Sequence, residues 1–290
     1  MTVPVASFFG LDLRSRTSAT TRIVSRISLT PAPVLAEHSG IVGVSAGAAL
    51  GCNIKSRQPG RAIRYNLRYC SDPRFCSYRS LFKTGNLFST DFCYREVPIR
   101  QDPFDFETFR SSPEEFYAVC TDVHSGKAVY HLCDDQEDAV LLDWIRASAS
   151  MPIVSHVVSV GGYDLLDGGI ADSIPLRFFE KQGYEKNVVI LTQPEGYRKE
   201  KNKAMPLLKL KEKHHPELLK KMAKRHEIYN ESVFYAEQQQ KDGKTLLIRP
   251  LGNLPSGRVE HDRARMKGTY EAGRAVAKAR LEEIKEFLKR

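Results

Sequence analysis

A serine flanked by glycines, placed where a strand should turn into a helix, constrains the fold of this chain more than any other feature. Residues 40–44 form a β-branched run typical of a buried strand, and residues 45–53 are small and compatible with a helix. The junction has the pattern G-x-S-x-G, and its members are Gly43, Val44, Ser45, Ala46 and Gly47. A sharp turn of this kind requires glycine beside the serine, because a side chain there would collide with the backbone. The pattern predicts a nucleophile elbow, although a turn that only packs a helix on its strand has the same form.

Such an elbow would place Ser45 for nucleophilic chemistry. Its hydroxyl would be exposed at the end of the strand. The backbone N–H of Ala46 and the N-terminus of the following helix would face the negative charge that develops on a carbonyl oxygen during acyl transfer. We therefore expect Ser45 to attack a carbonyl carbon.

The rest of the chain alternates strands and helices. Two pairs of strands are separated by turn residues, Ser125-Gly126 in the first pair and Gly161-Gly162 in the second, and each pair predicts a hairpin. The expected strands cover residues 21–29, 40–44, 115–121, 127–132, 155–160, 163–166, 188–192 and 244–249. The expected later helices cover residues 138–148, 216–240 and 270–290. This alternation predicts an α/β fold with a mostly parallel sheet and helices on both faces.

Two further segments gain weight from their order after the serine. Asp167-Gly168-Gly169 closes the second hairpin, and an Asp-Gly pair is by itself usually only a turn. Before it, residues 147–152 (Ala-Ser-Ala-Ser-Met-Pro) end a helix at a proline. The order G-x-S-x-G, A-S-x-S-M-P, D-G-G resembles the three ordered signatures of patatin-like phospholipases. Further likeness to the bacterial cytoplasmic branch of that family lies in residues 58–61, 69–74 and 85–88, and the resemblance extends over about residues 40–290.

The resemblance implies a fold, a reaction and a substrate class. The fold is a three-layer sandwich with a mostly parallel central sheet, with a catalytic domain over residues 39–195 and a basic, mainly helical extension over residues 196–290. The reaction uses a serine–aspartate dyad, in which Ser45 attacks an ester carbonyl, Asp167 accepts its proton, and water activated by Asp167 releases the fatty acid from an acyl-enzyme. The substrate is a lipid or phospholipid ester. We also expect no cofactor and no metal, and a cytoplasmic location.

One element that the resemblance leads us to expect is missing. Family members open with a strand and a G-G-G-x-[RK]-G loop that builds the oxyanion hole, whereas residues 1–39 contain one glycine, Gly10. Residues 1–38 are rich in Ser, Thr and Arg, which fits a transit peptide, a wrong start site or an out-of-frame stretch of translation. We therefore expect a poorly ordered segment, low activity, marginal stability and an unpaired edge where the first strand should lie.

Positive charge is concentrated near the C-terminus. Residues 196–290 hold 24 Lys/Arg against 13 Asp/Glu, a net charge of +11, so that residues 1–195 have a net charge of −2. Such a region favours peripheral contact with an anionic membrane, or is simply a solvated helical surface. No recognition motif accompanies the charge, so we expect no nucleic-acid partner. The sequence has no apolar run of about 18 residues, so we expect no membrane span. Its six cysteines include no C-x-x-C pair, and we expect them to be reduced thiols.

Several alternatives remain open. An α/β-hydrolase would complete a Ser…Asp…His triad with a histidine after Asp167, and His261 is the best placed of His214, His215, His226 and His261. A degenerate family member would bind a membrane surface or a partner without catalysis. A metal site at His124 and His131 lacks a third ligand at suitable spacing. The aromatic residues between positions 75 and 109 either line an acyl-chain pocket or fill the core.

Overall fold

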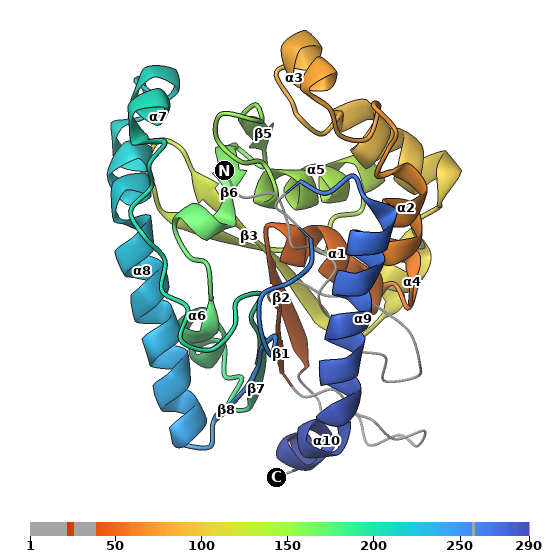
Figure 1. The fold of residues 1–290 in the computed structure, drawn as a ribbon, viewed down its shortest axis with the longest axis vertical. Helices are drawn as coiled ribbons and strands as arrows, with labels where there is room; N and C mark the ends of the chain where they lie inside the picture. Colours follow the sequence, from red (N-terminus) through yellow and green to blue (C-terminus); the bar gives the residue numbers. More distant parts are fainter. Residues whose placement is uncertain (1–21, 26–38, 257–258, 290) are drawn as a thin grey trace.

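The computed structural model describes residues 22–25, 39–256 and 259–289, and an eight-stranded sheet runs through them (Figure 1). The strand order is β5-β6-β3-β2-β1-β7-β8, and β4 pairs with β3 outside this path. The strands are β1 (Arg22–Ser25), β2 (Gly40–Val44), β3 (Glu115–Asp122), β4 (Ala128–Leu132), β5 (Val158–Val160), β6 (Tyr163–Asp167), β7 (Asn187–Ile190) and β8 (Thr245–Ile248). The helical segments are α1 (Ala46–Lys55), α2 (Arg61–Tyr69), α3 (Tyr78–Thr84), η1 (Phe92–Gln101), α4 (Phe106–Ser111), α5 (Asp138–Ser148), η2 (Gly168–Ile170), α6 (Leu176–Lys181), α7 (Met205–Lys211), α8 (Pro216–Lys241), α9 (Arg263–Ala279) and α10 (Leu281–Lys289).

The sheet is mixed, so the prediction of a mostly parallel sheet was wrong. The pairings β2–β3 and β7–β8 are parallel, and the other five pairings are antiparallel. The connections from β3 to β4 and from β5 to β6 are too short for a parallel crossover, which needs a dozen residues or more. The prediction relied on the alternation of strands and helices. It did not take into account that the two hairpins and β1 contribute antiparallel pairings to the same sheet.

Strand β1 occupies the position beside β2 that we expected to be unpaired. It lies between β2 and β7 and pairs antiparallel with both, with Ile23 opposite Val42 on one side and Val189 on the other. The expected open edge is therefore wrong, because backbone groups within the predicted short strand over residues 21–29 pair with β2. The remaining expectations for residues 1–38 lie outside the described residues.

Helices cover both faces of the sheet and make three layers (Figure 1). On one face, α6 and α8 pack against alternate residues of the central strands, such as Val42 and Val119. On the other face, α1 and α5 pack against Ile41 and Phe116, while α9 and α10 pack against Ile190. Consecutive residues of a strand point to opposite faces. The apolar run over β2 is therefore explained by burial on both sides.

Most local predictions are confirmed. β3 and β4 form the first predicted hairpin, and β5 and β6 form the second, with Gly161 and Gly162 at the positive φ that a tight two-residue turn requires. The helix predicted over residues 138–148 is α5. The helical region predicted over residues 270–290 begins earlier and divides into α9 and α10, because Asp262 caps the start of α9 by accepting from two backbone N–H groups.

The C-terminal extension is helical, as the resemblance implies, and it also completes the sheet and the core. β8 pairs in parallel with β7. From α8, Tyr229 and Val233 join the apolar cluster that contains Val42 and Phe179. The division of the chain after residue 195 stays a prediction, since both parts contribute to this core.

Two expectations from composition concern the membrane and the thiols. No helix in the described parts of the chain is long and apolar enough to span a bilayer. All six cysteines are free of disulfides. Burial raises the pKa of the Cys120 and Cys133 thiols well above the ordinary value, so both stay protonated and pack as small apolar side chains.

Replacing Phe109 by alanine should reduce the free energy of unfolding by about 3–5 kcal/mol, since a cavity would replace a fully buried ring. The ring packs against Phe104 and Phe116, with centroids 5.5 and 5.6 Å away. Urea denaturation followed by circular dichroism measures the loss. Phe82→Ala is the control, because 90% of Phe82 is exposed and its loss should change stability by less than about 0.5 kcal/mol. Equal losses in the two variants would contradict the assigned core.

Candidate active site

Ser45 lies at the turn between β2 and α1 in a strained backbone conformation. Its φ of 58° and ψ of −124° fall in a region that residues other than glycine rarely adopt. A Cβ on Gly43 would lie 2.5 Å from Ala48 Cα, so the close approach of helix and strand requires glycine there. The strand-to-helix turn predicted from G-x-S-x-G is thus present, with the serine at its apex.

The structure brings Ser45 and Asp167 together. Ser45 Oγ donates a hydrogen bond to Asp167 Oδ2 over 2.5 Å, although the two residues are 122 positions apart. The other carboxylate oxygen, Oδ1, accepts from the N–H of Gly169 over 2.8 Å. A Cβ on Gly168 would lie 2.0 Å from Val119 O, so the D-G-G turn packs against β3 at a distance that only glycine permits. Both carboxylate oxygens of Asp167 are therefore held, and one of them faces the serine hydroxyl.

The segment over residues 147–152 ties the backbones of both residues to the end of α5. Ser148 Oγ accepts from the N–H of Ser45 over 2.9 Å and donates to Val119 O over 2.6 Å. The N–H of Asp167 donates to Ser150 O over 2.7 Å. The sequence pattern A-S-x-S-M-P does not by itself predict these hydrogen bonds.

Asp167 is buried, with 3% of its surface exposed. Burial raises the pKa of its carboxyl group, because the ionised form loses its hydration. The Arg225 guanidinium opposes this increase most, followed by the hydrogen bonds from Ser45 and Gly169 and the charge of Lys199. Arg225 Nε also donates to Gly169 O over 2.6 Å, which fixes the cation beside the turn. The carboxyl group is thus a stronger base than a solvated aspartate and still has a nearby cation that favours its ionised form.

Comparison with known proteins places this chain in a family. The family model described as "Patatin-like phospholipase" matches residues 34–179, which is half of the chain. The chain belongs to the patatin-like phospholipase family. A second model, described as a domain of unknown function (DUF6363), matches residues 215–289. The "Uncharacterized protein YjjU" of Escherichia coli (strain K12) is 34% identical over 161 residues, which are 53% of this chain and 43% of that protein. The chain therefore spans less than half the length of this relative.

The patatin-like region presents the N-terminus of α1 next to Ser45. The N–H groups of Ala48 and Ala49 donate to Ser45 O over 2.9 and 3.2 Å. The preceding N–H groups, those of Ala46 and Gly47, belong to the first turn, whose donors have no acceptor within the helix. Ala46 lines the same cavity as Ser45. Its N–H is suited to an oxyanion, and this role stays a prediction.

A cavity of about 120 Å³ opens beside Ser45, and its walls are mainly apolar and aromatic. Phe75, Phe88 and Phe104 line it, whereas Phe109 lies in the core. The aromatic residues between positions 75 and 109 therefore divide between the two interpretations that the sequence left open. Its mainly apolar lining is of the kind found in pockets for apolar ligands.

A second cavity, of about 40 Å³, lies beside Asp167. It is lined by Asp167 together with Arg225 and Asn202, and Met151 lines both cavities. The whole cavity, whose other lining residues are mainly apolar, has room for about three water molecules. Ser45 thus borders a mainly apolar cavity, and Asp167 borders a smaller cavity that also has polar side chains in its lining.

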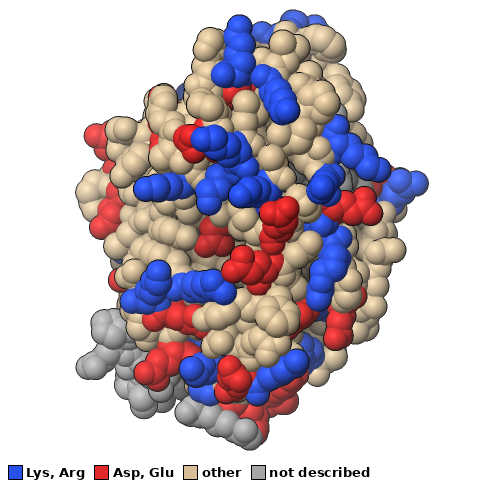
Figure 2. Space-filling model, turned by 90° about the vertical axis from the view of Figure 1, so that its left-hand side faces the viewer, with Lys and Arg blue, Asp and Glu red and all other residues tan. Residues whose placement is uncertain are grey.

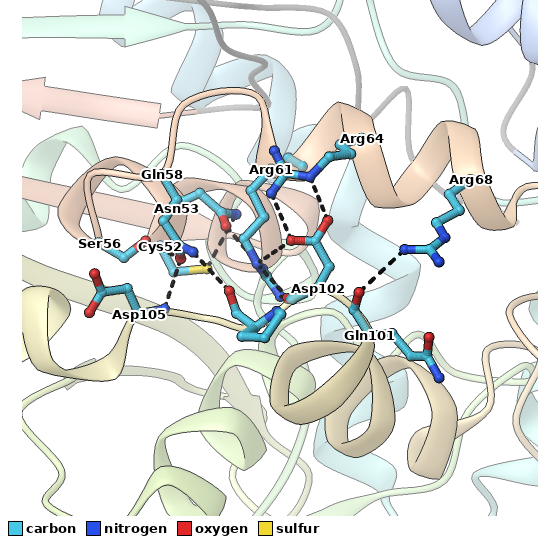
Figure 3. Close-up of polar contacts among 12 residues, drawn as sticks. Cys52, Asn53, Ser56, Gln58, Arg61, Arg64, Arg68, Gln101, Asp102 and Asp105 are labelled. Carbon is cyan, nitrogen blue, oxygen red and sulfur yellow. Dashed lines mark hydrogen bonds and ion pairs between the residues drawn. The ribbon is translucent and has the colours of Figure 1, made fainter.

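A buried arginine holds the wall of the larger cavity (Figure 3). Arg61 donates from Nε and Nη2 to Asp102 O over 2.9 and 2.6 Å, and from Nη1 to Asn53 Oδ1 over 3.0 Å. Arg64 binds the Asp102 carboxylate through two hydrogen bonds of 2.8 and 2.7 Å. These contacts join α1 and α2 to the end of η1. Arg61 belongs to the segment over residues 58–61 that resembles the family, and the structure gives that segment a packing role.

No histidine joins the dyad in the described residues. The side chain of Asp167 is hydrogen bonded to Ser45 and Gly169. His261 Nδ1 instead contacts Cys70 O over 2.7 Å. The Ser-Asp-His alternative therefore has no contact in this structure to support it.

The histidines near the first hairpin pair with single carboxylates. His124 Nε2 lies 2.8 Å from Asp164 Oδ2, and His131 Nε2 lies 2.8 Å from Asp135 Oδ2. Within residues 22–25, 39–256 and 259–289, no group of three His, Cys, Asp or Glu side chains is arranged to hold a metal ion.

Sequence reasoning missed Arg225 and Asn202. Arg225 is one of 24 basic residues in residues 196–290, and nothing in its neighbourhood along the chain distinguishes it. Asn202 belongs to a polar loop before α7. Only the packing of the extension against the D-G-G turn brings them beside Asp167.

Replacing Arg225 by methionine should move the acid limb of the pH profile to higher pH. The dyad expected from the sequence uses ionised Asp167 as proton acceptor. Loss of the cation destabilises that ionised form, so the pKa of Asp167 rises further. The measurement is the rate at which a fluorophosphonate labels Ser45 at each pH, followed by intact mass. Arg225→Lys keeps the charge without the Nε contact to Gly169 and should shift the limb less.

The matched control for charge is Lys224→Met, which removes an exposed cation from the same helix. Its profile should coincide with that of the parent chain. An equal shift in both variants would attribute the effect to net charge and not to Arg225.

Proposed function

We propose that this chain is a serine acyl hydrolase that cleaves carboxylic esters of lipids through Ser45 and Asp167. Membership of the patatin-like phospholipase family implies lipid acyl hydrolysis at a coarse level. The observation that carries the finer assignment is the 2.5 Å hydrogen bond from Ser45 Oγ to Asp167 Oδ2 at the wall of an apolar cavity. A short bond to a carboxylate gives the hydroxyl proton a direct acceptor.

The reaction proceeds in two halves. Ser45 Oγ attacks the ester carbonyl as its proton moves to Asp167, and collapse of the tetrahedral intermediate transfers that proton to the leaving alcohol. The acyl chain, now bound to Ser45, occupies the apolar cavity. Water then attacks the acyl-enzyme while Asp167 accepts its proton, and the fatty acid leaves as the proton returns to Ser45 Oγ. The small cavity beside Asp167 and Arg225 is suited to hold this water.

The environment compensates for the weakness of a carboxylate as a base. A solvated aspartate has a pKa of about 3.9 and takes a hydroxyl proton poorly. Burial raises the pKa of Asp167 and so increases its basicity. The N–H groups at the start of α1 provide part of the oxyanion stabilisation.

The proposal predicts that Ser45→Ala and Asp167→Asn each reduce hydrolysis of p-nitrophenyl butyrate by at least about 10³-fold, because one removes the nucleophile and the other its proton acceptor. The assay is initial rates at saturating ester, with folding checked by circular dichroism. His261→Ala is the control and should keep the rate of the parent. A large loss in His261→Ala would revive the triad, and full activity in Asp167→Asn would remove the dyad.

We further expect turnover to be slow. Residues 1–39 hold a single glycine, so no G-G-G-x-[RK]-G loop precedes the elbow in this sequence. Each missing oxyanion donor costs about 10² to 10³ in rate. The value of kcat/KM for a short-chain p-nitrophenyl ester should therefore fall at least about 10²-fold below that of a patatin-like enzyme with the loop. Equal values would show that α1 alone supplies enough stabilisation.

The missing loop also favours a second candidate, a family member that binds lipid without turning it over. In that case Ser45 would still react with a fluorophosphonate, because the dyad is in place, while ester turnover would be undetectable. Labelling together with turnover supports the hydrolase, and labelling without turnover supports the second candidate.

A further inference from the structure

Three segments meet at one end of the molecule, near the cavity beside Ser45. They are α3 with its neighbours, the loop before β5, and α7 with the residues before it, and α3 and α7 both lie at the upper end in Figure 1. We call them the rim, which comprises residues 73–90, 151–157 and 201–211. The loop contacts both helices: His156 Nε2 lies 2.8 Å from Thr84 O at the end of α3, and Lys211 Nζ at the end of α7 donates to Ser155 O over 3.0 Å. The rim is therefore one connected surface.

The rim borders the cavity of the proposed active site. Phe75 and Phe88, on either side of α3, line the cavity beside Ser45, and so do Met151 and Ser155 from the loop. A lipid that enters this cavity from the rim would reach Ser45 with its acyl chain against the aromatic wall.

Large apolar side chains are exposed on both rim helices. On α3, Tyr78 is 75% exposed and Phe82 is 90% exposed, and their spacing of four places them on one helix face. On α7, Leu207 is 46% exposed and Leu210 is 72% exposed, whereas Leu208 packs inward. Two helices thus present apolar side chains outward at the same end of the molecule, which is typical of a binding surface.

The charge of the rim is entirely positive. Residues 73–90, 151–157 and 201–211 contain no Asp or Glu. Five exposed cations of the rim have no ion-pair partner among the described residues, and these are Arg79, Lys83, Lys201, Lys203 and Lys209. In Figure 2, which faces α7 and α8, most of the charged side chains in the upper part of the surface are Lys and Arg, whereas both signs mix in the lower part. The rim thus offers both unpaired cations and exposed apolar side chains. An anionic bilayer matches both, because anionic headgroups lie directly above its apolar interior.

We propose that the rim docks on an anionic lipid bilayer, with Tyr78, Phe82, Leu207 and Leu210 inserted among the lipids and the surrounding lysines and arginines on the headgroups. The proposal deepens the proposed function, because a docked rim would let a lipid ester pass from the bilayer into the cavity beside Ser45. The test below does not require hydrolysis, so the two proposals can fail separately.

The experiment measures sedimentation of the full chain carrying Ser45→Ala with vesicles of phosphatidylcholine alone or mixed with phosphatidylglycerol. Each basic residue near an anionic surface strengthens binding about fivefold, so Lys203→Gln with Lys209→Gln should weaken binding to the mixed vesicles about 25-fold. Phe82→Ser with Leu210→Ser should weaken binding to both kinds of vesicle, by about tenfold per residue.

The controls lie at the far end of α8. Lys241→Gln with Lys244→Gln removes two exposed cations, and Phe234→Ser removes a side chain that is 57% exposed. Both should bind as the parent does. The proposal is overturned if the parent binds neither vesicle, if the rim variants bind as tightly as the parent, or if the control variants lose as much.

Analytical ultracentrifugation of the same proteins tests whether the rim instead binds a second copy of the chain. A parent dimer that becomes a monomer in Phe82→Ser with Leu210→Ser would assign the rim to a second copy of the chain and overturn the bilayer proposal. A parent that stays monomeric without vesicles, and binds the mixed vesicles through the rim, supports it.

Discussion

The hydrogen bond between Ser45 and Asp167 is the contact around which the rest of the structure is arranged. It requires Ser45 in a backbone conformation that costs about 1–3 kcal/mol, and it requires a buried carboxylate. Strand β3 makes both possible, because β2 and β6 each pair with it. At its centre, Val119 O accepts from Ser148, which holds the N–H of Ser45, and lies against Gly168 beside Asp167. One strand therefore fixes the separation of the two side chains.

Burial of Asp167 creates an electrostatic conflict that the C-terminal extension relieves. A dry site strengthens the carboxylate as a base but disfavours its ionised form. Arg225 reaches the site from α8, and Lys199 lies in the loop that follows β7. Both belong to residues 196–290, and α8 also packs into the central core. The extension is thus part of the site's electrostatics as well as of its scaffold, which is a physical reason for its close packing against the patatin-like region.

Among the described residues, the proposed nucleophile, the proposed base and the cavity are in place, whereas few donors are available to an oxyanion. Ser45 is hydrogen bonded to Asp167, and the cavity beside Ser45 is mainly apolar. For the oxyanion, the described residues offer the N-terminus of α1, whose first N–H groups lack partners within the helix. Each oxyanion donor is worth about 10² to 10³ in rate, so we expect stabilisation of the oxyanion to limit turnover.

The sequence by itself determined the features that depend on near neighbours: the strand and turn at Ser45, both hairpins, and helix α5. Through the order of three short motifs it also predicted the pairing of Ser45 with Asp167. Only the tertiary structure decided the strand directions, where the predicted parallel sheet was wrong, and the place of β1 inside the sheet. The hydrogen bond from Ser45 to Ser148 and the approach of Arg225 to Gly169 span 103 and 56 positions along the chain. No local pattern encodes such contacts, because they exist only once the sheet and the extension have packed together.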